Sequence, residues 1–296
     1  MKRFTVSAIG LIFSAFGAAS AQQNFDNVVI KPIPVAGAVH MLEGSGGNIG
    51  ASVGEDGILI VDDQFAPLAD KIKAALRGLG TGTGNPKYLV NTHFHGDHTG
   101  GNPIFGREAT IIAQANVRRR LAAEQRSGDR VTPPMVKEGL PVITFDQGLS
   151  VFFNGEEIKM IAAPNGHTDT DAFVYFTKSN VIHLGDHFFN GRFPYVDLGS
   201  GGSVDGLIRN IGMALSIVGP DTKIIPGHGP LGSKEDLRAY YGMLIETTDL
   251  IRGKIAKGMS VDESKKAGFP DKWKQWGSGF ISADRYIDTI YQSYAK

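Results

Sequence analysis

Three histidines and one aspartate lie within six consecutive residues of this chain, in the segment 93–98 with the sequence HFHGDH. The segment follows a short apolar run that predicts a buried strand. Alternate side chains of extended backbone point the same way, so His93 and His95 can face one point. Asp97 and His98 lie past a turn and can face a neighbouring point. Because imidazole and carboxylate groups bind zinc, this one loop could serve two metal ions, and the fold must deliver it at a strand end.

Three further candidate ligands also follow predicted strands. They are His167 in the sequence GHT, Asp186 in GD and His228 in GHG. A single histidine or aspartate after a strand is more often an ordinary loop residue than a metal ligand. Four such loops in one chain together indicate a metal site.

Cysteine is absent from all 296 residues, which excludes disulfides, thiolate zinc ligands and cysteine nucleophiles. Hydrophobic residues make up 42% and charged residues 20%, a composition typical of a globular protein. The formal net charge is zero, which argues against a dedicated nucleic-acid-binding protein. Any metal chemistry must therefore use nitrogen and oxygen ligands.

The first residues, 1–21, are typical of a secretory signal peptide. Two cations precede an apolar stretch, and a small-x-small pattern ends at Ala21. An N-terminal membrane anchor is the alternative, but the apolar stretch is short for a membrane span. We expect cleavage after Ala21, export to the periplasm or medium, and one mature domain, 22–296, that is not held to a membrane. Cleavage would leave 28 Lys+Arg against 30 Asp+Glu, a net charge of −2.

The apolar periodicity predicts strands before helices in each half of the chain. The expected strands are 39–42, 48–53, 58–61, 88–91, 110–113, 149–152, 157–162, 173–176, 181–184 and 222–225. The expected helices are 66–79, 116–126, about 204–217 after an N-cap at Ser203, 233–257 and 282–294. This order favours a sandwich of two sheets with helices outside.

The sequence resembles the metallo-β-lactamase superfamily of metal-dependent hydrolases. The resemblance rests on the HxHxDH, GHT, GD and GHG motifs, on their order and spacing, and on the segment 57–62, which ends in an aspartate. It implies an α/β fold, a four-layer αβ/βα sandwich of two mixed sheets flanked by helices. It also implies that the site lies at one edge of the two sheets.

The resemblance implies two zinc ions, with iron or manganese as alternatives, and seven ligands. The first ion would take His93, His95 and His167, the second would take Asp97, His98 and His228, and Asp186 would bridge them. Asp62 would orient the histidine-rich loop through hydrogen bonds. A hydroxide shared by the ions would attack the substrate carbonyl, and Asp97 would orient it as the catalytic carboxylate.

Two departures from the family pattern bear on the reaction. Asp186 stands where the commonest zinc β-lactamases carry a cysteine, and Phe189 stands where they often carry a substrate-binding lysine. We therefore expect a hydrolase of lactam, lactone or ester and thioester bonds with weak β-lactamase activity. A glyoxalase II-like thioesterase or a phosphodiesterase is the alternative, although no basic C-terminal cluster for glutathione is evident. A non-enzymatic metal-binding domain and an iron redox protein are the other classes considered.

The segment 190–202 follows the Asp186 motif and holds the candidate substrate contacts. Asn190, Arg192 and Tyr195 combine amide, cationic and aromatic groups that could hold a small anionic molecule. We expect Arg192 to contact a substrate carboxylate. A plain connection with packed aromatic residues is the alternative. The sequence leaves the oligomeric state open.

Overall fold

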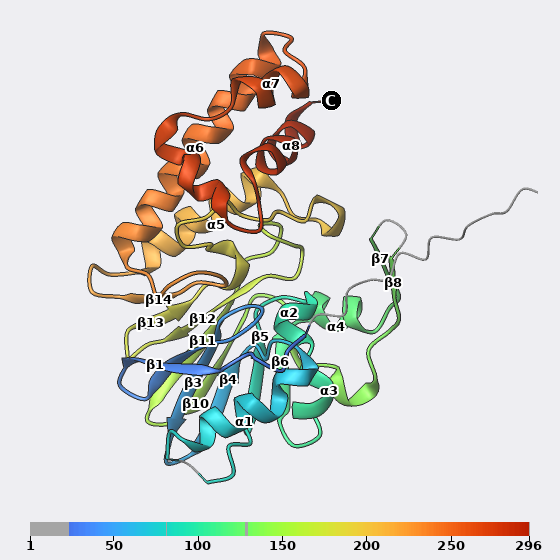
Figure 1. Ribbon diagram of the computed structural model, residues 1–296. Coiled ribbons are helices and arrows are strands. Elements are labelled where there is room, and N and C mark those ends of the chain that lie inside the picture. Colours follow the sequence, from blue (N-terminus) through green and yellow to red (C-terminus); the bar gives the residue numbers. More distant parts are fainter. Residues whose placement is uncertain (1–23, 81, 128–129, 296) are drawn as a thin grey trace, which may run out of the picture.

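The computed structural model describes residues 24–80, 82–127 and 130–295. The predicted signal peptide, 1–21, lies outside the described residues. Figure 1 shows four layers: helix α1 below, two β-sheets in the middle, and helices α5 and α6 above, with α7 and α8 beyond them. This arrangement confirms the predicted α/β sandwich of two mixed sheets.

The first sheet has seven strands in the described part of the chain, in the order β1-β2-β3-β4-β5-β6-β9. Strands β1 to β4 pair antiparallel, and β4, β5, β6 and β9 pair parallel. Their bounds are β1 Lys31–Ala36, β2 Val39–Glu43, β3 Ile49–Gly54, β4 Gly57–Val61, β5 Tyr88–Asn91, β6 Thr110–Gln114 and β9 Ile143–Phe145.

The second sheet has five strands in chain order, β10 to β14, and only its last pair, β13 and β14, is parallel. Their bounds are β10 Gly148–Phe153, β11 Glu156–Ala162, β12 Ala172–Phe176, β13 Val181–His183 and β14 Lys223–Ile225. A separate hairpin consists of β7 Gln125–Ser127 and β8 Arg130–Thr132.

The helices cover the outer faces of the sheets and supply the connections between strands. The α-helices are α1 Ala69–Arg77, α2 Gly96–Thr99, α3 Asn102–Phe105, α4 Ala115–Leu121, α5 Val204–Ile217, α6 Lys234–Ala256, α7 Val261–Ala267 and α8 Ala283–Tyr294. The 3₁₀ turns are η1 Ala66–Leu68, η2 Lys137–Gly139, η3 Gly185–His187, η4 Leu198–Ser200 and η5 Asp271–Ser278. In the described part of the chain, no helix combines the length and apolar character needed to cross a membrane.

The alternating direction of side chains along the buried strands explains how the layers form. In β4, Ile58 and Ile60 pack against α1, whereas Leu59 and Val61 pack into the space between the two sheets. Successive strand residues point to opposite faces, so a strand that is apolar at every position is covered on both sides. A third apolar cluster fills the space between the second sheet and helices α5, α6 and α8.

The helix caps agree with the sequence, but one predicted helix is too long. Ser203 accepts a hydrogen bond from the Gly206 amide at the start of α5, as predicted. The predicted helix 116–126 was wrong at its end, because α4 stops at Leu121 and the chain continues into the hairpin of β7 and β8. Strand pairing in this hairpin outweighs the helical propensity of the residues after Leu121.

Candidate metal centre

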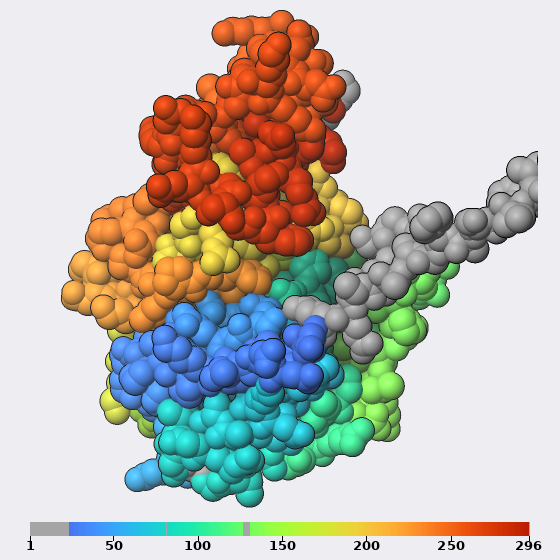
Figure 2. Space-filling view, in the orientation of Figure 1, coloured from blue at the N-terminus to red at the C-terminus, as the bar shows by residue number. Residues whose placement is uncertain are grey.

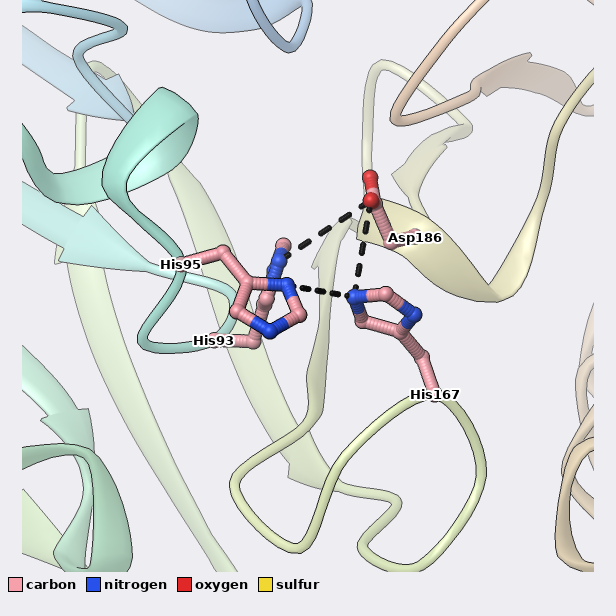
Figure 3. A group of neighbouring side chains, drawn as sticks. All are labelled: His93, His95, His167 and Asp186. Atoms are coloured by element: carbon pink, nitrogen blue, oxygen red, sulfur yellow. Dashed lines mark hydrogen bonds and ion pairs between the residues drawn. The ribbon is translucent and has the colours of Figure 1, made fainter. Parts of the chain in front are cut away.

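All seven predicted ligands meet where strands of the two sheets end. His93 and His95 follow β5, and Asp186 lies in η3 directly after β13. His167 comes from the loop between β11 and β12. Figure 3 shows these four side chains pointing toward one another from the two sheets. Their ligand atoms lie within 4.8 Å of one another, and Asp97, His98 and His228 form a second group of the same kind.

The first cluster, which consists of His93, His95, His167 and Asp186, is tightly packed. His95 Nδ1 lies 2.8 Å from His167 Nε2. Asp186 Oδ2 lies 3.5 Å from His167 Nε2 and 3.9 Å from His93 Nε2. These contacts are dashed in Figure 3. Three imidazole nitrogens and one carboxylate oxygen therefore surround a common point.

The second cluster, which consists of Asp97, His98 and His228, also faces Asp186. His98 Nε2 lies 3.1 Å from Asp186 Oδ1. His228 Nε2 lies 3.4 Å from Asp97 Oδ2 and 3.4 Å from Asp186 Oδ2. Asp186 is therefore the carboxylate that lies between the two groups.

The outer hydrogen bonds of the imidazoles show that the first cluster fits a cation. His167 Nδ1 donates to the Tyr195 carbonyl at 2.7 Å, and His95 Nε2 donates to Asp197 Oδ2 at 3.0 Å. With those nitrogens protonated, His95 Nδ1 and His167 Nε2 face each other with lone pairs. Two facing lone pairs repel each other unless a positive ion accepts both.

Three buried polar atoms of the clusters have no hydrogen-bond partner among the described residues. They are His93 Nε2, His98 Nε2 and Asp186 Oδ1, of which the last two lie 3.1 Å apart in the ion-pair contact given above but form no hydrogen bond with each other. An unpaired buried polar atom costs free energy, so each unsatisfied atom requires an explanation. A pair of divalent metal ions provides one, since histidine and carboxylate donors suit zinc and also iron.

Asp62 holds the histidine-rich loop, in the role that the resemblance implied for it. Its Oδ1 accepts from the Thr92 amide at 2.7 Å, and its Oδ2 accepts from Thr92 Oγ1 and from His98 Nδ1, each at 2.7 Å. The bond to Nδ1 fixes the ring of His98 so that Nε2 faces Asp186. Asp62 is completely buried.

Asn48 anchors the loop that carries His228. Its Nδ2 donates to the carbonyls of Pro226 and Gly229, at 3.0 and 2.9 Å. Gly227, between them, approaches Asp186 so closely that a Cβ at this position would collide with Oδ1. The GHG motif is therefore glycine-rich because the backbone must pass directly against the carboxylate.

Burial and neighbouring charges shift the pKa values of side chains in the two clusters in different directions. Burial lowers the pKa of His167 to about 4 and lowers that of His93 well below its usual value. Although burial opposes the shift, Asp186 and Asp97 raise the pKa of His228 to about 9. Burial would raise the pKa of Asp97, but His98 and His228 lower this pKa to about 2. A metal must therefore displace a proton at His228, whereas His93 and His167 of the first cluster already present neutral imidazoles.

The three predicted substrate contacts differ in position. The Tyr195 ring centroid lies 5.9 Å from that of His95 and 5.7 Å from that of His167. Arg192 is exposed. The Asn190 side chain donates to the Pro230 carbonyl at 3.0 Å, so its amide also braces the His228 loop.

Sequence reasoning missed Asp197 and a clamp around the first cluster. Arg120 in α4 makes a two-point ion pair with Asp169, with N–O distances of 2.5 and 2.8 Å. The Arg120 guanidinium also lies 5.0 Å from the ring centroid of Phe94, which is the residue between the candidate ligands His93 and His95. In the sequence, Arg118, Arg119 and Arg120 form a short basic run that is typical of a solvated helix face, and the partner of Arg120 lies 49 residues away.

The family model described as the metallo-beta-lactamase superfamily matches residues 45–234, which is more than half of the chain. The chain therefore belongs to the metallo-β-lactamase superfamily. This membership confirms the resemblance seen in the motifs.

Two relatives match parts of the chain. The hydroxyacylglutathione hydrolase of Nitrosococcus oceani is 32% identical over 143 residues, 47% of each protein. The beta-lactamase-like protein 2 homolog of Caenorhabditis elegans is 25% identical over 178 residues, 60% of this chain and 53% of the relative. The chain thus matches about half the length of these relatives.

Solved structures share the fold at low sequence identity. The sec-alkylsulfatase Pisa1 from a Pseudomonas species superposes with a TM-score of 0.67 at 14% identity, over 90% of this chain and 50% of that chain. The DIM-1 metallo-beta-lactamase gives a TM-score of 0.59 at 18% identity, over 74% of this chain and 99% of that chain. These similarities concern the fold alone.

Proposed function

We propose that the protein is a metal-dependent hydrolase with two zinc ions that cleaves acyl bonds of small molecules: lactams, lactones, esters or thioesters. The observation that carries this proposal is the pair of adjacent clusters, in which Asp186 of the first cluster lies 3.1 Å from His98 Nε2 and 3.4 Å from His228 Nε2 of the second. A single structural metal would need one such cluster. Two adjacent clusters that share a carboxylate suit a hydrolytic site with two ions.

The first cluster and the second cluster would each hold one zinc ion, and the chain supplies orientation around them. When bound, such ions lower the pKa of water to about 7 and polarise a carbonyl oxygen. The Asp97 side chain is 29% exposed, against 5% for Asp186, so Asp97 is the more accessible carboxylate. Its Oδ2 faces His98 and His228. Asp97 would accept a hydrogen bond from the attacking water and so aim the oxygen lone pair at the carbonyl.

The acyl class is supported by the site residues and by one relative. The relative that is 32% identical is described as a hydroxyacylglutathione hydrolase, which favours a thioester among the acyl substrates. The Phe189 ring stacks on the His228 ring with centroids 5.0 Å apart. An aromatic side chain at this position supplies no cation for a lactam carboxylate, so β-lactamase activity should be weak.

A substrate panel tests the proposal. We expect the zinc-loaded protein to hydrolyse at least one of a cephalosporin, an acyl-homoserine lactone and S-lactoylglutathione, and the metal-free protein to hydrolyse none. Loading with iron(II) or manganese(II) in parallel identifies the metal that supports turnover. Hydrolysis of bis-p-nitrophenyl phosphate alone would contradict the acyl class and favour a phosphodiesterase.

A variant of the second cluster tests the role of both ions. His98→Ala should lower kcat for the best substrate by at least about a hundredfold, because the second ion loses an imidazole. The control is His40→Gln, which changes a histidine of β2 outside both clusters. Equal turnover by His98→Ala and the unmodified protein would contradict a mechanism with two ions.

A further inference from the structure

The C-terminal segment that contains η5 and Phe280 packs near the two clusters, although it lies beyond the residues 45–234 that match the family model. The Phe193 amide donates to the Trp276 carbonyl at 3.0 Å, which joins the segment 190–202 to η5. The Phe280 ring meets the Tyr195 ring edge-on, with centroids 6.4 Å apart. Figure 2 shows the red C-terminal residues lying against the yellow residues near position 200. A chain of rings therefore runs from the ligands His95 and His167 through Tyr195 to Phe280.

Phe280 is an exposed aromatic side chain in an unusual position. Its side chain is 73% exposed, and Phe152 is the other exposed phenylalanine of the described residues. Single exposed apolar residues need no explanation, but Phe280 is connected through Tyr195 to the metal clusters. The Arg285 guanidinium lies 4.9 Å from the centre of the Phe280 ring, so a cation lies over this apolar surface.

The stem of a second arginine, Arg192, lies beside Gly279, the residue before Phe280. A Cβ placed on Gly279 would be 3.0 Å from Cδ of Arg192, so this glycine leaves room for the arginine stem next to Phe280. Arg192 and Arg285 are both exposed. Among the described residues, neither guanidinium has a hydrogen bond or ion pair to a carboxylate.

The nearby carboxylate is already engaged. Asp197 lies two residues from Tyr195 in the sequence. Its Oδ2 binds His95 at 3.0 Å, and its Oδ1 accepts from the Ser200 amide at 3.1 Å. Both arginines thus keep their hydrogen-bond donors for a molecule that comes from solvent.

We propose that Tyr195, Phe280, Arg192 and Arg285, here termed the C-terminal patch, bind the part of the substrate that extends away from the metal clusters. The chemistry selects an acyl compound with a flat apolar group and an anionic, carboxylate-type group. The apolar group lies against Phe280 and Tyr195, and the anionic group binds Arg285 and Arg192. This assignment rests on the proposed function for the bond that is cleaved, but the binding itself can be measured without turnover.

Three small carboxylate compounds, used as probes, separate the contributions of charge and of the aromatic ring to binding. Benzylsuccinate carries two carboxylates and a phenyl group, succinate lacks the ring, and 3-phenylpropionate lacks the second carboxylate. Calorimetric titration of the zinc-loaded protein should show that benzylsuccinate binds at least about tenfold more tightly than either of the others. If none of the three binds, or if all three bind equally, the proposal is overturned.

Variants of the C-terminal patch assign each contribution. Arg285→Ala should weaken benzylsuccinate binding about tenfold and leave 3-phenylpropionate unchanged. Phe280→Ala should remove the preference for benzylsuccinate over succinate, and Phe280→Tyr should keep it. Arg238→Ala, at an exposed arginine of α6, is the matched control. Because these side chains are exposed, the variants should fold like the unmodified protein. Unchanged affinities in Arg285→Ala and Phe280→Ala would overturn the proposal.

The outcome for binding and the outcome for hydrolysis are independent. Loss of benzylsuccinate binding in Arg285→Ala, with no turnover of any acyl substrate by the unmodified protein, would support the C-terminal patch and contradict the proposed hydrolase. Acyl hydrolysis by the unmodified protein, together with a benzylsuccinate affinity that is unchanged in Arg285→Ala and Phe280→Ala, would support the proposed hydrolase and contradict binding at the C-terminal patch.

Discussion

Asp186 lies between the two groups of imidazoles, and the character of the site depends on this one residue. Its two carboxylate oxygens lie 3.1 to 3.9 Å from imidazole nitrogens of both clusters. Burial would raise its pKa, but His228 and His98 hold that pKa well below the usual value. An oxygen ligand at this position is harder than a thiolate, so the site should discriminate less between zinc and iron. It also cannot be oxidised as a thiolate can.

Asp62→Asn tests how strongly the orientation of His98 matters. An amide cannot accept all three hydrogen bonds that Asp62 receives from Thr92 and His98. We expect zinc affinity of the second cluster to fall about 10- to 100-fold, as is common when the partner of a ligand is changed. Competition with a chromophoric chelator measures this affinity.

The neighbouring Asp63 offers a matched control. Burial raises the pKa of Asp63 well above its usual value, and its Oδ2 has no hydrogen-bond partner among the described residues. Asp63→Asn keeps an oxygen that can accept the hydrogen bond from the Gly101 amide, and Asp63 contacts none of the candidate ligands through a hydrogen bond of its side chain, so zinc affinity should be unchanged. If both variants bind zinc like the unmodified protein, the orienting role of Asp62 is wrong.

The candidate ligands and their support Asp62 could be predicted from the sequence, whereas the other supports could not. The ligands are crowded into short motifs at strand ends, where local spacing limits which side chains can meet. Asp197 binds His95 across 102 residues, and Asn48 binds the His228 loop across 178 residues. Nothing in the local sequence of either residue indicates such a partner. The zinc ions themselves remain a proposal.

At the scale of elements, α4 connects the two loops that supply the first cluster. Its Arg120 pairs with Asp169 two residues after His167, and covers Phe94 between His93 and His95. Asn116 of the same helix donates to the Asp169 carbonyl at 3.0 Å. The helix therefore fixes the distance between two loops that are far apart in the sequence.

Arg120→Ala should loosen this connection. We expect zinc affinity of the first cluster to fall about tenfold while the second cluster keeps its affinity, because Arg120 supports His95 and His167 but not His228. Stepwise zinc titration followed by calorimetry resolves the two events. Arg119→Ala, at the exposed neighbour in α4, should change neither. An equal loss at both clusters would indicate a general loosening of the fold instead.

Elements with strong local signals were predictable, and those that depend on partners were not. The serine caps of α5 and α6 and the apolar strands β4 and β5 follow from local patterns. Strand β1 was missed, because Pro32 and Pro34 argue against a strand. It forms at the edge of the first sheet, where proline is tolerated. The early end of α4 depends on the pairing of β7 with β8, which the local sequence does not reveal.

At the scale of the whole molecule, the two clusters of candidate ligands connect the two sheets. The histidine-rich loop follows the first sheet, and Asp186 and His228 follow strands of the second. Ions that bind only the folded arrangement should therefore stabilise the entire sandwich. The chain has no cysteine, so disulfides do not contribute.

Removal of zinc should lower the melting temperature. Zinc at a hundred times its Kd adds about 2.7 kcal/mol per site. In a chain of this size each kcal/mol corresponds to roughly 2–4 °C, so zinc should raise Tm by at least about 5 °C. Differential scanning calorimetry after exhaustive chelation and after zinc addition measures the shift, and His228→Ala should reduce it. An identical Tm with and without zinc would show that the clusters do not bind it in the folded state.

Asp186 is proposed to join two adjacent metal sites, and the number of zinc ions bound per chain is a direct test of this claim. Native mass spectrometry of the zinc-loaded protein should show two zinc ions per chain, and His228→Ala should retain one. A single zinc ion in the unmodified protein, or two in His228→Ala at the same free zinc concentration, would contradict the claim.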